Sequence, residues 1–258
     1  YELIDDEAEK INRAAGKTEL LILPGTEIST SDVHVLGVFP RLDPRRKIHF
    51  IINDLLNDVG IDMDGWGRNP AVGTASVYRT IDLIVQKGGL PLVAHIDADS
   101  KAMFNLYEMG GGAMKGVVCH PRLNAIEIVY PDKLKKHNSK LKKTPHRWLR
   151  GARNDAGLPL LSYFQGSDAH ALNAIAKRFT YVKMTAPSFD GLKSAVAIPS
   201  SRLRLSQVHK QRKSGWFVYG LEVDNGHFGK QAIRFNLHLN CIVGKRETGK
   251  SSILRLMK

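Results

Sequence analysis

Five side chains of the kinds that bind divalent metal ions follow short apolar runs along the chain. They are Glu27, His34, His95, Asp168 and His170. Imidazole nitrogen and carboxylate oxygen together form the donor set that proteins offer to zinc, manganese or iron. Asp168 and His170 are two residues apart, and side chains alternate with period two in an extended segment, so both would point the same way. These residue types predict a divalent metal site.

The segments that would carry these residues alternate between helix and strand patterns. Helical spacing of apolar residues marks 1–15, 48–59, 74–87 and 189–196, whereas short apolar runs at 20–23, 33–39, 90–96, 125–130, 161–165 and 180–184 predict strands. The stretch 60–74, rich in Gly, Asp and Asn, predicts a loop. This alternation is typical of an α/β fold with a parallel sheet or barrel, whose functional groups lie at the C-terminal ends of the strands.

The order and local context of the five residues resemble the PHP (polymerase and histidinol phosphatase) family over residues 1 to about 200. The matching motifs are P-G-x-E at 24–27, H-x-L-G at 34–37, A-H at 94–95 and G-S-D-A-H at 166–170. The resemblance implies a distorted (β/α)7-type barrel and a cluster of metal ions that hydrolyses phosphate esters. Glu27 would be the bridging carboxylate, and the other four would be further ligands. It also implies H-x-H and D-H motifs ahead of residue 1, without which the site is incomplete.

The chemistry implied is hydrolysis of a phosphate ester by a metal-bound water, because a divalent ion lowers the pKa of that water. No side-chain nucleophile is assigned. Cys119-His120 and Ser167 lie in no nucleophile elbow or triad pattern.

The two cysteines, Cys119 and Cys241, form no disulfide framework, and reduced thiols are expected. No apolar stretch is long enough to span a membrane and no secretory signal is evident, so we expect a cytoplasmic protein.

A second motif lies near the end of the sequence. Residues 244–251, GKRETGKS, match the P-loop pattern G-x-x-x-x-G-K-[ST] between an apolar run at 239–243 and a predicted helix at 252–257. The predicted nucleotide-binding residues are Gly244, Gly249, Lys250 and Ser251, with Lys250 reaching the β and γ phosphates of ATP and Ser251 binding Mg²⁺. The context resembles ATPases of the SMC and ABC type. No acidic strand follows within residues 252–258, so this segment alone is not expected to hydrolyse ATP.

The charge of the chain favours a polyanionic partner. The formal net charge is +13, and residues 133–153 hold nine Lys and Arg with no Asp or Glu. Such a field attracts nucleic acid. Two interpretations of 133–153 stay open: a solvated, mobile basic loop, or a surface that contacts phosphates.

These patterns predict a PHP-like domain at 1–200, a basic linker at 201–214 and the first part of a P-loop ATPase domain at 215–258. A PHP domain followed by a P-loop ATPase resembles the TrlF-type family, also through 179–183 and PSFDGLKSA at 187–195. The resemblance implies a metal-dependent nuclease coupled to an ATPase, in nucleic-acid processing or phage defence. Two alternatives are an inactive PHP module that binds nucleic acid or a partner, and a small-molecule phosphatase. Oligomerisation is compatible with the sequence.

Overall fold

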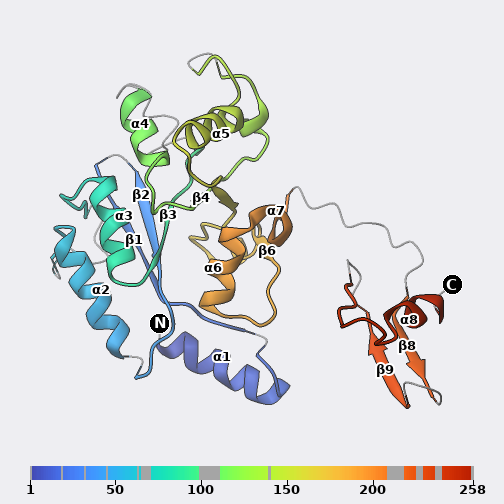
Figure 1. Ribbon diagram of the computed structural model, residues 1–258. Helices are drawn as coiled ribbons and strands as arrows, with labels where there is room; N and C mark the ends of the chain where they lie inside the picture. The colour runs from blue at the N-terminus through green and yellow to red at the C-terminus, as the bar shows by residue number, and fades with distance from the viewer. Residues whose placement is uncertain are drawn as a thin grey trace. The chain divides into compact units, whose positions relative to one another are not determined.

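The computed structural model of the chain describes residues 2–256 except 19, 32, 45, 63, 65–70, 99–110, 139–140, 208–217, 225–228 and 236–239. The chain divides into two compact units, Tyr1–His209 and Lys210–Lys258 (Figure 1). The first unit is a mixed α/β structure that contains all five predicted metal ligands.

A five-stranded sheet forms the centre of the first unit, in the order β1-β2-β3-β4-β5. The strands are β1 (Gly25–Ser29), β2 (His34–Val38), β3 (Leu90–Val93), β4 (Ala125–Glu127) and β5 (Ser162–Phe164). β2 pairs antiparallel with β1 and β3, whereas β4 pairs parallel with β3 and β5. The end of β1, the start of β2 and the carboxyl ends of the other three strands therefore meet at one edge.

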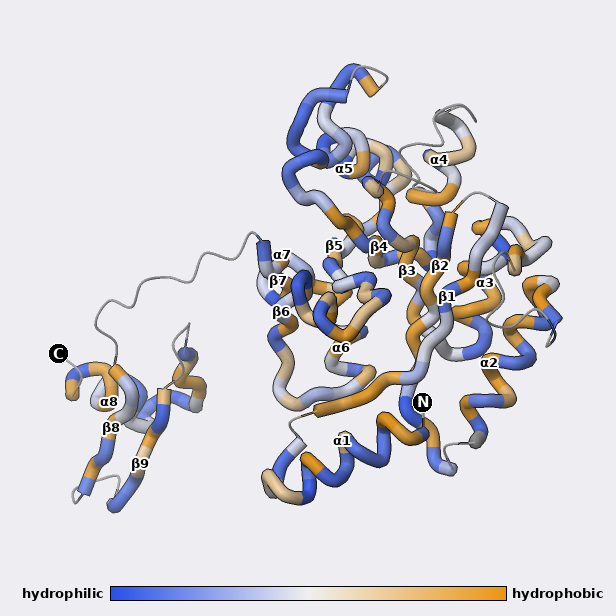
Figure 2. The backbone as a smooth tube through the Cα atoms, turned by 180° about the vertical axis from the view of Figure 1, so that it is seen from behind, coloured by the Kyte–Doolittle hydropathy of each residue, from blue (hydrophilic) through white to orange (hydrophobic). Residues whose placement is uncertain are grey.

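Each face of this sheet has its own apolar core. On one face, Ile28, Val35, Val93 and Ile126 join the larger core with residues of α2 (Arg46–Asp58), α3 (Val77–Gln86), α4 (Gly111–Val118) and α5 (Pro145–Asp155). On the other face, Leu92 and Ala125 pack with Phe189 and Val196 of α6 (Phe189–Ala197). Figure 2 shows β3 as largely apolar, whereas most of β1 is drawn in pale tones. Because side chains alternate along a strand, Glu27 and His34 lie on the α6 face.

Polar caps explain where three of the helices begin. The hydroxyls of Ser76, Thr144 and Ser188 each accept a hydrogen bond from the backbone N–H three residues later, at 3.2, 3.2 and 2.9 Å. A side-chain acceptor at this position satisfies an amide that has no partner within the helix. Pro145 follows the cap of α5 in the first helical turn, where its fixed φ suits the helix.

The remaining elements of the first unit surround the sheet. They are α1 (Glu2–Ala15), η3 (Lys133–Lys135), η4 (Leu172–Ala174), β6 (Thr180–Val182), α7 (Pro199–Arg202) and β7 (Leu203–Leu205). β6 and β7 form an antiparallel ribbon. α1 is held by an ion pair between Arg41 and the buried carboxylate of Asp5, at 3.0 Å.

Four sequence predictions about the first unit need correction. The predicted strand at 20–23 is absent, and the strand starts at Gly25, where a Cβ would lie 2.8 Å from the Gly37 carbonyl oxygen. Leu203–Leu205, assigned to the linker, forms β7 because it pairs with β6. The segment 133–153 is not wholly a loop, since it contains η3 and most of α5. In the described residues the main sheet stays open instead of closing into a barrel, with β1 and β5 as its two outermost strands.

The second unit contains an antiparallel ribbon and one helix. β8 (Gly220–Val223) pairs with β9 (Gln231–Arg234), and α8 (Lys250–Leu256) follows the GKRETGKS segment. The apolar run 239–243 predicts a strand, but residues 240–243 form no strand among the described residues, and 239 lies outside the described residues. Of the predicted linker, 208–214 also lies outside them. Among the described helices, none is long and apolar enough to cross a bilayer.

Candidate metal centre

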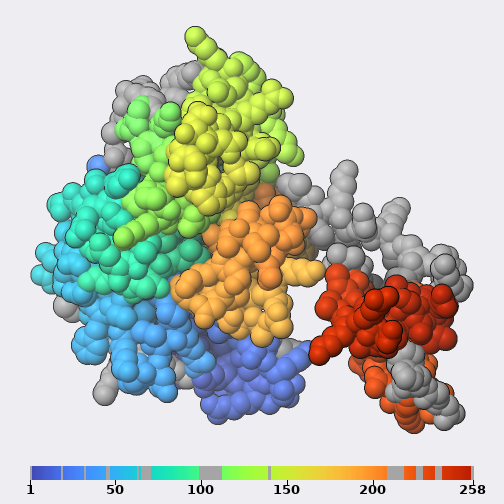
Figure 3. Space-filling model, in the orientation of Figure 1, coloured from blue at the N-terminus to red at the C-terminus, as the bar shows by residue number. Residues whose placement is uncertain are grey.

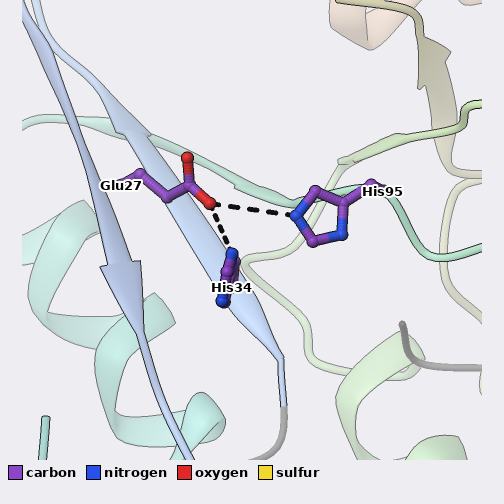
Figure 4. A group of neighbouring side chains, drawn as sticks. All are labelled: Glu27, His34 and His95. Atoms are coloured by element: carbon purple, nitrogen blue, oxygen red, sulfur yellow. Dashed lines mark hydrogen bonds and ion pairs between the residues drawn. The ribbon is translucent and has the colours of Figure 1, made fainter. Parts of the chain in front are cut away.

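Three of the five predicted ligands converge at the shared edge of the sheet. Glu27 comes from β1, His34 opens β2 and His95 follows β3, and one donor atom from each lies within 4.8 Å of the others. Glu27 Oε1 is 2.5 Å from His34 Nδ1 and 3.8 Å from His95 Nε2 (Figure 4). The two imidazole rings meet edge to face, with centroids 5.0 Å apart. A carboxylate between two imidazoles is a donor set suited to a divalent transition metal.

Two imidazole nitrogens of this group have no hydrogen-bond partner within the described part of the chain. They are His34 Nε2 and His95 Nδ1, and both are buried. Each is the ring nitrogen opposite the one near Glu27 Oε1, since the carboxylate lies beside His34 Nδ1 and His95 Nε2. An ion bound between Glu27 and the two near nitrogens would leave the far nitrogens unpaired, so each of them needs a further partner of its own.

The electrostatics of the group are those of a proton-holding pair. The pKa of Glu27 is lowered, chiefly by its contact with His95, and the charge of His34 adds to this effect against the opposing effect of burial. The pKa of His95 is raised, chiefly by Glu27, with smaller contributions from Glu127 and Asp168. The contact therefore favours a protonated imidazole beside an ionised carboxylate when no ion is bound.

Asp168 and His170 lie outside this group of three. They follow β5, and His170 Nε2 is 3.6 Å from Asp168 Oδ1. The Asp168 side chain is 49% exposed and that of His170 is 91% exposed, so His170 faces solvent. Asp168 is nevertheless close enough to His95 to raise the pKa of that imidazole. The turn that carries them is held by Arg178, which donates to the carbonyls of Gly166 and Ser167 at 3.3 and 3.1 Å.

Backbone conformation marks both turns as constrained. His95 and Asp168 have positive φ angles of 29° and 48°. A residue other than glycine costs roughly 1–3 kcal/mol in such a conformation and persists only where its surroundings hold it. The strain thus falls on two of the predicted ligands.

Glu127 is a polar residue at this edge that sequence reasoning missed. It ends β4 and is 9% exposed. Burial raises its pKa, while hydrogen bonds from the backbone of His95 and Gly166 act in the opposite direction. The sequence contained one signal for it, because Glu127 is the single acid inside the apolar run 125–130. A buried carboxylate requires hydrogen-bond donors, so an acid within such a run indicates polar groups nearby in the fold.

The basic segment 133–153 begins six residues after β4, and its first residue, Lys133, reaches the turn that follows β3. Lys133 Nζ donates to the Asp97 carbonyl at 3.5 Å, two residues beyond His95, and lies 4.1 Å from the centre of the Tyr130 ring. The described cations Lys135, Lys136, Lys142, Lys143, Arg147 and Arg150 are exposed. Figure 2 shows the part ahead of α5 as hydrophilic, and in Figure 3 the segment forms a lobe of the face in view.

Arg153 does not belong to this charged surface. Its side chain is fully buried, and its guanidinium donates to the carbonyls of Pro159, Val118 and His120 at 2.6, 3.1 and 3.1 Å. These bonds join the end of α5 to the end of α4. Arg153 is therefore a structural cation.

The predicted nucleotide-binding residues form an exposed turn in the second unit. Lys250 opens α8, and its Nζ donates to the Gly244 carbonyl at 2.8 Å and to that of Lys245. Thr248 donates its hydroxyl to the Lys245 carbonyl at 2.8 Å, and Gly249 has a φ of 84° that favours glycine. The loop thus wraps around the ammonium group of Lys250, while Ser251 is exposed on the first turn of the helix.

Comparisons with known proteins found distant structural likenesses, among them two crystal structures. No protein-family model and no curated protein matches the chain. The lesion-specific endonuclease PfuEndoQ from Pyrococcus furiosus is 13% identical, with a TM-score of 0.46 over 70% of this chain, which spans only 40% of the endonuclease. A structure described as a metal-dependent phosphoesterase from Bifidobacterium adolescentis is 15% identical, with a TM-score of 0.33 over 73% of this chain and 79% of its own. Likenesses this weak establish no shared activity.

Proposed function

We propose that the first unit is a divalent-metal phosphoesterase of the PHP type that acts on nucleic acid. The observation that carries this proposal is the convergence of Glu27, His34 and His95, with donor atoms within 4.8 Å of one another. Asp168, whose charge acts on His95, extends the donor set along the same edge. When bound, divalent ions supply the Lewis acidity that activates water and neutralises charge on the scissile phosphate.

The residues of this chain have separate tasks in the proposed reaction. Glu27, His34 and His95 would hold the metal, with Asp168 and His170 completing the set. In the absence of metal, the contact with Glu27 also raises the pKa of His95 and so favours its protonated form. The exposed cations between Lys133 and Arg150 would bind the phosphates flanking the cleaved bond, since they follow β4 at the edge where the candidate ligands meet.

Nucleic acid is favoured over a small phosphate ester by the length of the basic segment. Nine cations lie within 21 residues with no acid among them (133–153), and of the eight that the structure describes only Arg153 is fully buried. A small substrate offers one or two phosphates, whereas a nucleic acid offers a row of them. We propose DNA or RNA as the substrate and manganese, zinc or iron as the metal.

The second unit extends the proposal to nucleotide control. GKRETGKS carries the residue types that surround the phosphates of ATP, and the lysine of the motif already lies within the curve of the loop. We propose that ATP with Mg²⁺ binds here through Gly244, Gly249, Lys250 and Ser251. Nuclease activity coupled to this module, in nucleic-acid processing or phage defence, belongs to the same proposal.

One observation favours the non-catalytic alternative, in which the first unit only binds nucleic acid or a partner. His170 is 91% exposed and stands apart from the group of three. A metal set reduced to three donors would hold ions weakly. The metal content of the purified protein separates the two functions, because tightly bound ions are expected only for the enzyme.

The test combines metal binding with cleavage. The full chain is titrated with Mn²⁺ and then incubated with labelled single- and double-stranded DNA and RNA. We expect His95→Ala to abolish cleavage and tight Mn²⁺ binding, and His49→Ala, at an exposed histidine of α2, to leave both unchanged. Equal cleavage by the wild-type protein and the folded His95→Ala variant would remove the proposal.

A further inference from the structure

Glu127 occupies a central place among the strands that carry the candidate ligands. It ends β4, which lies between β3 and β5. His95 follows β3, and the turn with Asp168 and His170 follows β5. Within β4 the side chains of Ala125 and Glu127 share one face, which is the α6 face of the sheet. The carboxylate therefore lies on the face to which Glu27 and His34 belong.

The two oxygens of Glu127 bind one neighbouring strand end each. Oε2 accepts a hydrogen bond from the backbone N–H of His95 at 3.2 Å, and Oε1 accepts one from the backbone N–H of Gly166 at 3.0 Å. The Glu127 carbonyl accepts a further bond from the Ile96 N–H at 3.0 Å. One residue thus fixes the turn after β3 from both its side chain and its backbone.

The approach to Gly166 leaves no space for another side chain. A Cβ at Gly166 would lie 2.6 Å from Glu127 Oε1, a distance that real Cβ atoms essentially never show. Glycine at this position is what lets the carboxylate reach the amide. Two residues later, Asp168 adopts its positive φ, so the ligand-bearing turn starts from the amide that Glu127 holds.

We propose that Glu127 is a positioning residue that sets the separation between the turn carrying His95 and the turn carrying Asp168 and His170. The proposal rests on the metal site of the proposed function, since the distance matters only if both turns contribute donors to shared ions. Each oxygen of Glu127 already accepts a backbone N–H, and for this reason we assign the carboxylate to positioning the two turns rather than to binding the metal.

Glu127→Gln is the direct test, because it keeps the shape of the side chain but turns an NH2 group toward one of two N–H donors. In the metal-free protein, we expect the amide that faces the NH2 group, either that of His95 or that of Gly166, to exchange with solvent on the order of tenfold faster. Mn²⁺ affinity is expected to fall by about 10–100-fold, which is typical of a residue that supports a ligand. Unfolding by urea establishes that the variant remains folded.

Ser162→Ala is the matched control on the neighbouring strand. Ser162 is also buried and donates to the Val196 carbonyl at 2.7 Å, away from the candidate ligands. Its loss should lower stability and leave both amides and Mn²⁺ affinity unchanged. If Glu127→Gln fails to fold, Gly166→Ala disturbs the same contact from the other side with Glu127 intact, and faster exchange of the His95 amide is expected.

Other outcomes separate this proposal from its alternatives. Wild-type exchange rates and Mn²⁺ affinity in a folded Glu127→Gln variant would overturn the positioning role, as would an unaltered His95 amide in Gly166→Ala. Loss of one bound Mn²⁺ with unchanged exchange would make Glu127 a ligand instead. If the wild-type protein binds no Mn²⁺, the proposed function fails, while the exchange rates still judge the contact that Glu127 makes.

Discussion

Glu27 and His34 face each other diagonally across the β1–β2 hairpin, with Oε1 2.5 Å from Nδ1. The register pairs Glu27 with Leu36 and Ser29 with His34, so the two side chains are two positions apart on the same face. Diagonal neighbours on a sheet come within reach of long side chains. The hairpin alone therefore places two candidate donors, and β3 brings the third.

Replacing the carboxylate tests this arrangement. Loss of a residue that only supports a metal ligand typically weakens metal binding by about 10–100-fold. We expect Glu27→Gln to weaken Mn²⁺ binding by more than this, because the substitution removes a charged ligand. The same substitution should lower the pKa of His95, since Glu27 is the chief cause of its rise. Calorimetry and an NMR titration of the histidines measure the two effects. Glu7→Gln, at an exposed glutamate of α1, is the control.

The metal-free protein should lose stability as the pH rises. The contact with Glu27 raises the pKa of His95 above its ordinary value of 6.5, so the folded state binds this proton more tightly than the unfolded state does. The stabilising contribution is full below the unfolded pKa and is lost as the pH rises through the folded pKa. Urea unfolding with chelator, from about pH 5 to about pH 9, should show this fall in the wild-type protein and not in His95→Gln. Parallel curves for the two proteins would contradict the pairing.

Nucleic-acid binding should depend steeply on salt through the segment around α5. Arg147 and Arg150 are exposed on this helix. If each contacts a phosphate, Arg147→Gln with Arg150→Gln should reduce the slope of log K against log salt by about 1 per contact. Fluorescence anisotropy with labelled duplex at several salt concentrations measures the slope. Lys10→Gln on α1 serves as a control of like charge, and an unchanged slope in the double variant would place the phosphates elsewhere.

The helical structure of α5 predicts a large penalty for truncating its buried face. Leu149 is 2% exposed within the larger core. Leu149→Ala should lower the free energy of unfolding by about 2–5 kcal/mol, because a buried side chain is replaced by a cavity. Arg147→Ala, exposed on the same helix, should change it by no more than about 0.5 kcal/mol. Equal unfolding curves for the two variants would restore the interpretation of this segment as a solvated loop.

The P-loop motif makes a separate prediction for the second unit. Lys250→Ala should weaken ATP–Mg²⁺ binding by roughly 10–100-fold, because a charge-assisted hydrogen bond to phosphate is removed. Lys245→Ala is the control, because it removes a neighbouring charge of the loop at a position where the motif requires no particular side chain. A fluorescent ATP analogue reports the affinity of both. Comparable binding by Lys250→Ala and the wild-type protein would remove the nucleotide site.

The sequence was informative where periodicity and chemistry agree. Helices α2, α3 and α6 follow their apolar spacing, and strands β3, β4 and β5 fall within the predicted runs. The approach of Glu27, His34 and His95 could be predicted because strand ends that share an edge collect the side chains that follow them. Spacing alone did not show that Glu27 lies within a strand, since β1 contains one fully buried apolar residue, Ile28.

Other features depend on long-range contacts that no local pattern reveals. The charge of 133–153 concealed α5, although Thr144 and Pro145 form a helix start. Nothing in the spacing of nine cations shows that Arg153 is the one that turns inward to three carbonyls. Glu127 was read as part of an apolar strand, because its two donors belong to residues 32 and 39 positions away.

The alternation of side chains in the β1–β2 hairpin ties the chemistry of this protein to its folding. Ile28 and Val35 are fully buried, each next in sequence to a candidate donor, Glu27 and His34. If the pairing of the hairpin shifted by a single position, the buried apolar side chains and the candidate donors would exchange faces. A carboxylate would then enter the larger core and an isoleucine would lie on the polar side. Misfolded hairpins would therefore be too unstable to accumulate, and every folded molecule would present both donors in one fixed arrangement.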